Sequence, residues 1–191
     1  VRSMKLHGGA FGDRAGRRPS KEELEAENVE AMLDGARTNL DRHIRNMSGF
    51  GMPVVVSINR FASDTDAELE ALADAARASG AYDVCLTEVH AQGGEGGAPL
   101  AKAVVRAVQD HVAAGRPFTP LFMPDAPVME KVEGIAKRLY GAEEVTVSAS
   151  AKKQLERFET WGYGHLPVCM AKTQYSFSHD AGGLGAPTGF T

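Results

Sequence analysis

The chain has 191 residues, of which 43% are hydrophobic and 24% are charged, a composition typical of a soluble globular protein. The formal net charge of −4 lacks the basic excess of nucleic-acid-binding proteins, so no nucleic acid is expected as a partner. No apolar run approaches the length of a membrane span and no signal peptide opens the chain, which favours a cytoplasmic protein without a membrane partner.

The N-terminal part predicts a short strand followed by a long helix. Residues 1–6 are partly apolar and break at His7-Gly8-Gly9, which is typical of a strand that ends in a glycine turn. Ser20-Lys-Glu-Glu23 has the spacing of a capping box, and apolar residues then recur at helical spacing to about residue 47. Gly35 weakens the middle of this helix by about 1 kcal/mol relative to Ala unless a neighbour packs closely there.

Two predicted strands at the centre of the chain end in polar or glycine-rich segments. Residues 53–58 stop at the polar corner 59–64, and residues 82–89 lead into the glycines of 93–97. Between them a second capping box, Thr65-Asp-Ala-Glu68, predicts a helix that Gly80 ends, with a buried stripe at Leu69, Leu72, Ala73 and Ala76. Because a helix joins the strands, we expect them to be parallel, with both loops at the carboxyl edge of the sheet, where open α/β folds bind ligands.

The same alternation continues to the end of the chain. After a helix from Pro99 to Gly115, with a buried stripe at Leu100, Val104, Val108 and Val112, we expect an edge strand at 118–123 and strands at 144–147 and 166–171. Helices are expected at 127–141 and at 150–162, the latter buried through Leu155, Phe158 and Trp161. Cys85 and Cys169 fall in predicted buried strands, which favours free thiols in a reducing compartment. The predicted fold class is α/β, a mainly parallel sheet with helices on both faces.

Several blocks of the sequence, taken in order, resemble one enzyme family. They are Val1-Arg-Ser-Met-Lys-Leu-His-Gly-Gly9, Val55-Val-Ser-Ile-Asn-Arg-Phe61, Gly93-Gly-Glu-Gly-Gly97 and Leu166-Pro-Val-Cys-Met-Ala-Lys-Thr-Gln-Tyr-Ser-Phe-Ser178. Together they resemble the formate–tetrahydrofolate ligases, or formyltetrahydrofolate synthetases, with Ser3 where alanine is usual. The resemblance implies a P-loop NTPase-like or Rossmann-like fold in a partial chain. Residues 1–52 would end a nucleotide-binding domain, and residues 53–191 would form an α/β folate-binding portion.

The resemblance also implies a reaction in two steps. ATP with Mg²⁺ phosphorylates formate to formyl phosphate, and N10 of tetrahydrofolate then attacks it to give 10-formyltetrahydrofolate and phosphate. A homotetramer or other homo-oligomer and a monovalent cation are further implications. The family binds ATP phosphates with an upstream P-loop, and no G-x-x-x-x-G-K-[ST] motif occurs in these residues. The alternative is therefore a non-catalytic folate-binding or oligomerisation fragment, inactive without that P-loop.

Two residues of the central loops resemble the family's folate site. Phe61 corresponds to an aromatic on which the pterin stacks, against the alternative of a loop side chain tucked into the core. His90 stands where the family usually has tryptophan, the other wall of the pterin slot. Imidazole is smaller and chargeable, so we expect a looser slot, unless His90 merely fills space.

The other candidate positions concern anions and the nucleotide. The glycines that precede a helix N-terminus suit formyl phosphate or a folate carboxylate better than a purely structural turn: Gly93, Gly94, Gly96 and Gly97. Four nucleotide-site candidates resemble a family signature near the nucleotide site: Lys5, His7, Gly8 and Gly9. Three more loosely resemble, at a stretched spacing, the base-reading corner of P-loop nucleotide-binding proteins, and the last of them has helix capping as its alternative: Asn59, Arg60 and Asp64. Three polar residues follow the last predicted strand and face either the site or solvent: Lys172, Thr173 and Gln174. No catalytic residue is assigned, and the remaining histidines show no metal-ligand spacing.

Overall fold

The structure, a computed structural model, describes residues 1–11, 19–171, 175–180 and 182–191. The chain divides into two compact units, Val1–Phe118 and Thr119–Thr191. This division does not coincide with the one expected near residue 52, and the assignment of nucleotide and folate portions stays a prediction. None of the helices in the described ranges is both long and apolar enough to cross a membrane.

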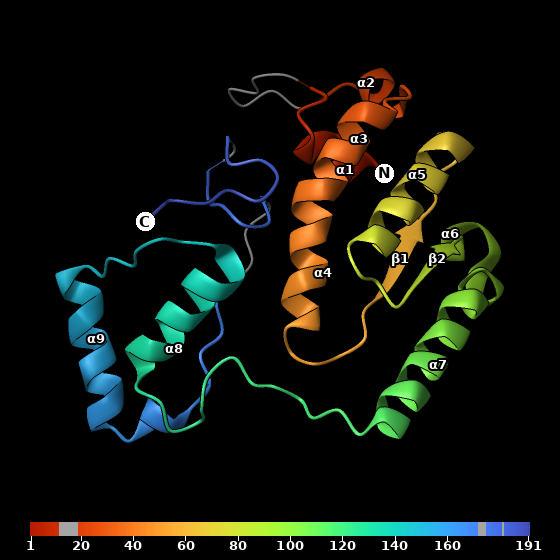
Figure 1. Ribbon diagram of the computed structural model, residues 1–191. Coiled ribbons are helices and arrows are strands. Elements are labelled where there is room, and N and C mark those ends of the chain that lie inside the picture. Colours follow the sequence, from red (N-terminus) through yellow and green to blue (C-terminus); the bar gives the residue numbers. More distant parts are fainter. Residues whose placement is uncertain (12–18, 172–174, 181) are drawn as a thin grey trace. The chain divides into compact units, whose positions relative to one another are not determined.

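The first unit combines a small parallel sheet with helices, as an α/β chain should (Figure 1). Its elements in chain order are α1 (Arg2–His7), α2 (Lys21–Glu25), α3 (Val29–Gly35), the π-helical turn η1 (Ala36–Leu40), α4 (Asp41–Ser48), β1 (Val55–Asn59), α5 (Asp66–Ala78), β2 (Asp83–Thr87), α6 (Val89–Gln92), the 3₁₀ turn η2 (Gly93–Gly97) and α7 (Ala98–Ala114).

The two central strands pair in parallel, which confirms the expectation from the helix between them. The register matches Val56 with Val84 and Asn59 with Thr87. Val56, Ile58 and Val84 face the core formed with α3 and α5. Cys85 lies on the opposite face, where its Sγ is 3.8 Å from the Pro99 carbonyl of α7. Helices therefore cover both faces of this two-stranded sheet.

The N-terminal segment is a helix, and the prediction of a strand there was wrong. The physical reason is a buried ion pair, in which Lys5 Nζ lies 3.0 Å from Glu68 Oε1 of α5 and both side chains are at most 1% exposed. Lys5 Nζ also donates to the Ala26 carbonyl at 2.9 Å. A lysine that must turn inward to a distant helix leaves no signal in the local apolar pattern.

The long helix expected from residue 20 is interrupted. The Ser20–Glu23 capping box is present, but α2 ends after Glu25 and a second cap, Asn28, starts α3 with its side chain accepting from Ala31 N–H. Glu68 Oε1 accepts a hydrogen bond from the Asn28 backbone N–H at 2.9 Å. The carboxylate that binds Lys5 therefore also stabilises the interruption between α2 and α3. From Val29 the chain is helical to Ser48, through the π-helical turn at Ala36–Leu40.

Gly35 marks a close helix crossing, so the closely packed neighbour that would justify a glycine there is present. An added Cβ at Gly35 would lie 1.9 Å from the Met4 carbonyl oxygen, and one at Gly8 would lie 1.7 Å from the Ala31 carbonyl oxygen. These neighbours are backbone atoms and cannot move aside singly. The two glycines let α1 and α3 approach at backbone distance.

Replacing Gly35 by Ala should force α1 away from α3. We expect the free energy of unfolding to fall by about 1 to 3 kcal/mol, the usual cost of overpacking. Urea denaturation of Gly35→Ala measures this change. Gly94→Ala is the matched control, because no atom of the residues that the structure describes lies within 4 Å of its added Cβ. Equal stability of the two variants would contradict the proposed close crossing.

Helix α7 begins and ends as expected but buries a different face. Pro99 lies in its first turn, and Gly115 ends it with φ of 60°. Its interior residues are Ala103 and Ala107, whereas Val104, Val108 and Val112 are 45%, 55% and 71% exposed. The predicted valine stripe was wrong, because the helix lies close to the sheet through alanines.

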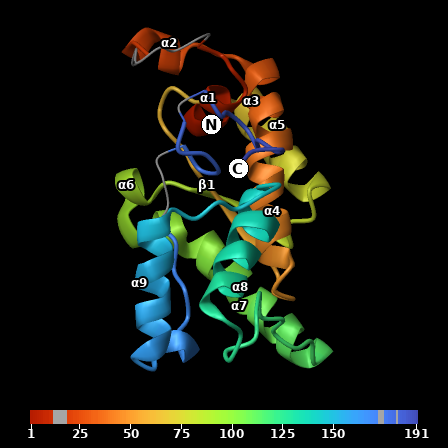
Figure 2. The ribbon, with the colours of Figure 1, turned by 90° about the vertical axis from the view of Figure 1, so that its left-hand side faces the viewer.

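The second unit, residues 119–191, is built on two helical segments and connecting loops. Its elements are α8 (Val128–Gly134), the π-helical turn η3 (Ile135–Tyr140), α9 (Ala149–Thr160) and the 3₁₀ turn η4 (Tyr163–His165). In Figure 2, α8 and α9 lie side by side, and Glu159 of α9 accepts from the Val128 N–H at 3.2 Å. The described part contains no strand at 118–123, 144–147 or 166–171, so those three predictions were wrong.

Two burial predictions in this unit also failed. Phe158 and Trp161 of the α9 segment are 42% and 55% exposed, and they contact each other edge to face instead of filling a core. Cys169 is exposed, whereas Cys85 is buried as expected. Since the described part of the second unit offers residues 166–171 no strand to pair with, their apolar side chains have no sheet in which to be buried.

Candidate functional site

The loops that carry Phe61 and His90 leave the same edge of the sheet. β1 ends at Asn59 and β2 ends at its partner Thr87, and the Arg60 N–H donates to the Thr87 carbonyl at 3.0 Å. Phe61 follows two residues after the end of β1, and His90 follows three residues after the end of β2. The expectation that both loops share the carboxyl edge is confirmed by this parallel pairing.

A tight turn places Phe61 at that edge. The Asp64 N–H donates to the Phe61 carbonyl at 3.0 Å, and Asp64 Oδ2 accepts the Phe61 N–H at 2.9 Å. Asp64 is buried, while Phe61 as a residue is 44% exposed and therefore not tucked into the core. The Thr65 side chain, not Asp64, caps α5. Asp64 therefore fixes the backbone conformation at Phe61 through these two hydrogen bonds.

His90 lies on the short helix α6 and is exposed. Gln92 of the same helix donates to Glu88 Oε2 at 2.8 Å, and the chain then reverses at Gly93, which has φ of 60°. A left-handed backbone at Gly93 is available to glycine at no steric cost. The turn directs the chain from the end of β2 towards the N-terminus of α7.

The glycine segment folds back on the end of β2. The Glu88 N–H donates to the Gly96 carbonyl at 3.2 Å, and a Cβ at Gly96 would lie 2.6 Å from the Glu88 carbonyl carbon and oxygen. Gly96 is therefore required for packing, whereas a Cβ at Gly94 would meet none of the described residues within 4 Å. Anion binding by these four glycines stays a prediction.

The nucleotide-site candidates lie in two different surroundings. Lys5 and His7 are buried within α1, and the Lys5 ammonium is engaged by Glu68. Gly8 is packed against α3, and Gly9 has φ of 78° with no atom of the described residues within 4 Å of an added Cβ. Asn59 and Arg60 are exposed, and the Arg60 guanidinium is 3.1 Å from Asp66. Lys172, Thr173 and Gln174 lie outside the described residues.

Residues outside the predicted set also contact this edge. Arg2 donates to Ser63 Oγ at 3.1 Å, and its guanidinium carbon lies 4.4 Å from the centroid of the Phe61 ring. Ser57 and Thr87 hydroxyls are 3.0 Å apart across the strands. No spacing rule connects Arg2 to Phe61, because the contact joins positions far apart in the chain.

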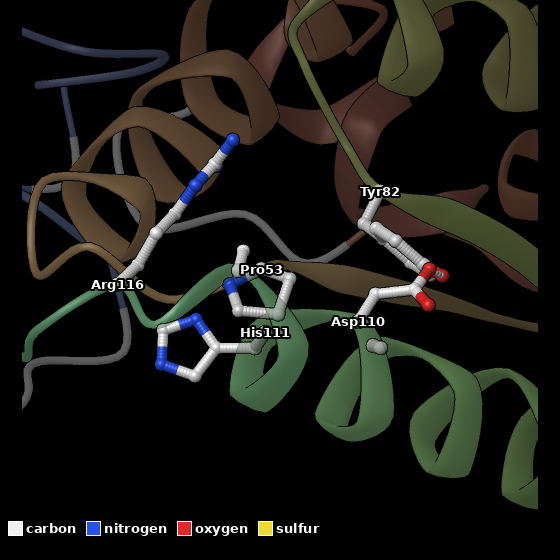
Figure 3. A pocket seen from close by; sticks show the side chains of 7 residues that line it. Pro53, Tyr82, Asp110, His111 and Arg116 are labelled. Carbon is white, nitrogen blue, oxygen red and sulfur yellow. Dashed lines mark hydrogen bonds between the residues drawn. The ribbon is translucent and has the colours of Figure 1, made fainter.

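A cavity of about 290 Å³ lies at the other end of the sheet (Figure 3). Its lining includes Pro53, just before β1, and Tyr82, just before β2. Tyr82 points towards Asp110 and donates a hydrogen bond to it at 2.5 Å, which raises the pKa of Tyr82 above its usual value. This amino-end cavity is separate from the edge that carries Phe61.

The described residues offer little further chemistry of their own. Within them, no group of three or more His, Cys, Asp or Glu side chains is arranged to hold a metal ion. Burial raises the pKa of the Cys85 thiol, which keeps it protonated and unreactive. What the edge presents is a half-exposed aromatic ring, an imidazole and a glycine turn.

Comparison with known proteins places the chain in one family. The model of the family described as formate–tetrahydrofolate ligase matches residues 1–191. The chain is 48% identical over 189 residues to the formate–tetrahydrofolate ligase of Ruegeria sp. (strain TM1040), a match that covers 99% of this chain and 31% of that protein. The proteins of the same name from Paracoccus denitrificans (strain Pd 1222) and Granulibacter bethesdensis (strain ATCC BAA-1260 / CGDNIH1) are 46% and 44% identical, over 100% and 99% of this chain and 32% and 31% of their own lengths.

The chain thus spans about a third of the length of the relatives that it matches. The match extends over both compact units and includes the Phe61 corner, the His90 helix and the glycine turn. This chain belongs to the formate–tetrahydrofolate ligase family.

Proposed function

We propose that this chain is the folate-binding part of an ATP-dependent ligase that forms 10-formyltetrahydrofolate from formate and tetrahydrofolate. Family membership over residues 1–191 and the names of the relatives support this proposal. The observation that carries it is the shared sheet edge of Phe61 and His90, beside a glycine turn that leads into α7. The P-loop-like or Rossmann-like fold of the whole protein belongs to the same proposal.

The chemistry requires activation of formate. Formate is an anion and a poor electrophile, so the γ-phosphoryl group of ATP is transferred to one formate oxygen, giving formyl phosphate and ADP. N10 of tetrahydrofolate attacks the formyl carbon, the carbon–oxygen bond to phosphate breaks, and the amine proton is lost. Holding several anions together calls for cations and backbone N–H groups near the reacting atoms.

We assign binding roles, and no catalytic role, to residues of this chain. Phe61 offers a face on which the pterin stacks, and His90 forms the opposite wall. The N–H groups of Gly93, Gly94, Gly96 and Gly97, followed by the α7 N-terminus, receive formyl phosphate or a folate carboxylate. The remaining surface candidates for the nucleotide are Gly9, Asn59 and Arg60.

In this proposal, Mg²⁺ and the phosphates of ATP are bound by residues other than the candidates named above. The described residues hold no cluster that fits Mg²⁺ or a monovalent cation through His, Cys, Asp or Glu, so no step is assigned to either ion here. The sequence contains no G-x-x-x-x-G-K-[ST] motif to hold ATP phosphates. In our proposal Mg²⁺ enters with ATP, on a portion that carries the P-loop.

The alternative function is a folate-binding or oligomerisation part without turnover. The absence of a P-loop motif from the 191 residues favours this alternative for the chain alone. The exposed valines of α7 suit a contact between copies in a homo-oligomer. A cytoplasmic location accompanies either function. The decisive assay is ADP release that depends on both formate and tetrahydrofolate.

This assay should be run on the chain alone and on a longer form with a P-loop portion before Val1. We expect dependent ADP release from the longer form only, while the chain alone still binds tetrahydrofolate. Absence of formate-dependent ADP release from the longer form would refute the ligase function.

Replacing His90 by Trp should tighten tetrahydrofolate binding about 3- to 10-fold, because a larger aromatic wall stacks better on the pterin. Calorimetric titration under anaerobic conditions measures the dissociation constant. His111→Trp is the matched control, since His111 lines the cavity at the amino end of the sheet. An unchanged or weaker affinity in His90→Trp would show that His90 is not part of the slot.

A further inference from the structure

The Phe61 ring carries an arginine on one side. The Arg2 guanidinium carbon lies 4.4 Å from the ring centroid, close enough for a cation–π contact. Arg2 belongs to α1 and Phe61 to the turn after β1, so the contact brings two separate elements to the edge that the proposed function uses.

The other contacts of Arg2 are too weak to account for its position. Its Nη2 donates to Ser63 Oγ at 3.1 Å and lies 3.5 Å from Glu25 Oε1. The Arg2 and Glu25 side chains are 32% and 33% exposed, and an ion pair with that exposure contributes little.

The guanidinium also gives up a hydrogen bond in this position. Arg2 Nε is buried, and none of the described residues accepts a hydrogen bond from it. A side chain held only by hydrogen bonds would not bury an unmatched donor, because that loss opposes folding. The contact with the Phe61 ring adds to the Ser63 and Glu25 contacts that hold the guanidinium in this position.

The rest of Phe61 is arranged to present the ring. Asp64 bonds to its N–H and carbonyl, which fixes the backbone, and 44% of the residue remains exposed with Arg2 in place. Part of Phe61 is therefore open to solvent while the Arg2 guanidinium contacts its ring.

We propose that Arg2 is a positioning residue for Phe61, and this inference rests on the function proposed above. The guanidinium holds the ring from behind and draws electron density away from the face that the pterin meets. A less electron-rich face stacks better on an electron-rich ring. Tetrahydropterin, with its conjugated amine nitrogens, is richer in electrons than oxidised pterin, so Arg2 favours reduced over oxidised folate.

The experiment compares Arg2→Met and Arg2→Lys with wild type. We expect Arg2→Met to raise the dissociation constant for tetrahydrofolate about 2- to 5-fold and to change that for folic acid less. Arg2→Lys keeps the positive charge but lacks the planar guanidinium, so its dissociation constant for tetrahydrofolate should lie between those of wild type and Arg2→Met. Arg45→Met is the matched control, because Arg45 is exposed, pairs with Asp41 at 2.6 Å within α4 and is not one of the candidate binding residues.

The outcomes separate this proposal from the proposed function. A fall in melting temperature with no change in the ratio of the two dissociation constants would mean that Arg2 only ties α1 to the turn. If wild type binds neither folate, the folate-binding function fails, and the χ1 angle of Phe61, measured by NMR scalar couplings, then decides the positioning role. An unchanged χ1 angle in Arg2→Met overturns that role, and a changed or averaged angle supports it.

Discussion

Glu68→Gln should lower the free energy of unfolding of the first unit by about 3 to 5 kcal/mol. The substitution leaves the Lys5 ammonium buried without a counter-charge, since both side chains are at most 1% exposed and their charged atoms are 3.0 Å apart. It also weakens the acceptor for the Asn28 N–H, which holds the break between α2 and α3. Urea denaturation followed by far-UV circular dichroism measures the loss.

Two further variants make this result specific to a buried pair. Lys5→Met combined with Glu68→Gln removes the unpaired charge, so the double variant should be more stable than Glu68→Gln alone. Asp74→Asn is the matched control, because Asp74 pairs with Arg77 at 3.0 Å with both side chains largely exposed. A loss in Glu68→Gln no larger than in Asp74→Asn would contradict the central role of the pair.

The effect of Glu68 should also depend on pH. Burial raises its pKa, but hydrogen bonds from the Asn28 N–H, the Lys5 ammonium and the Thr65 N–H, with the attraction of Lys5, outweigh burial and lower the pKa below 4.5. The unfolded state then binds the proton more readily than the folded state. The stabilisation is present above about pH 4.5 and is lost as pH falls through the folded pKa, so the difference between wild type and Glu68→Gln should shrink there.

Lys131→Met should destabilise the second unit by about 2 to 4 kcal/mol, the second-largest effect that we expect. Lys131 is fully buried, and its Nζ donates to the carbonyls of Pro124, Gly164 and Leu166 at 2.8, 2.7 and 3.1 Å. Methionine fills much of the same space but donates to none of them. Part of the lost bonding is offset, because the ammonium no longer has to be desolvated.

Hydrogen exchange in the loops that Lys131 holds measures the lost hydrogen bonds more directly than the stability of the whole unit does. Hydrogen exchange at residues 119–127 and 163–166 should accelerate in Lys131→Met, since only Lys131 Nζ links the three carbonyls among the described contacts. Lys137→Met on the same helical segment is the control, because Lys137 is half exposed and lies 3.8 Å from Glu133. Similar exchange in the two variants would rule out a structural role for the buried ammonium.

Short-range patterns predicted local structure well. Both capping boxes formed at Ser20–Glu23 and Thr65–Glu68, and glycines end α5 and α7, because these interactions join residues within one turn. The buried stripe of α5 was also predicted correctly. The parallel pairing of β1 and β2 followed from the helix between them.

Patterns failed wherever the partner lies far away in the chain. The N-terminal segment predicted to be a strand is a helix, and its Lys5 pairs with Glu68, which lies 63 residues further along the chain. The strands expected at 118–123, 144–147 and 166–171 did not form in the described part, because an apolar run becomes a strand only beside another strand. The valines of α7 recur at helical spacing, but the helix lies so close to the sheet that the face with the smaller alanines is the buried one.

The sequence by itself determined the family, the capped helices and the edge at which the candidate folate residues lie, since ordered motifs and one-turn contacts are written in consecutive residues. Only the tertiary structure decided that Lys5 is interior, that Asp64 supports Phe61 and that Arg2 stands behind its ring. The reason is that such contacts depend on where separate elements meet, and the free energy of burial that brings them together is shared over the whole unit.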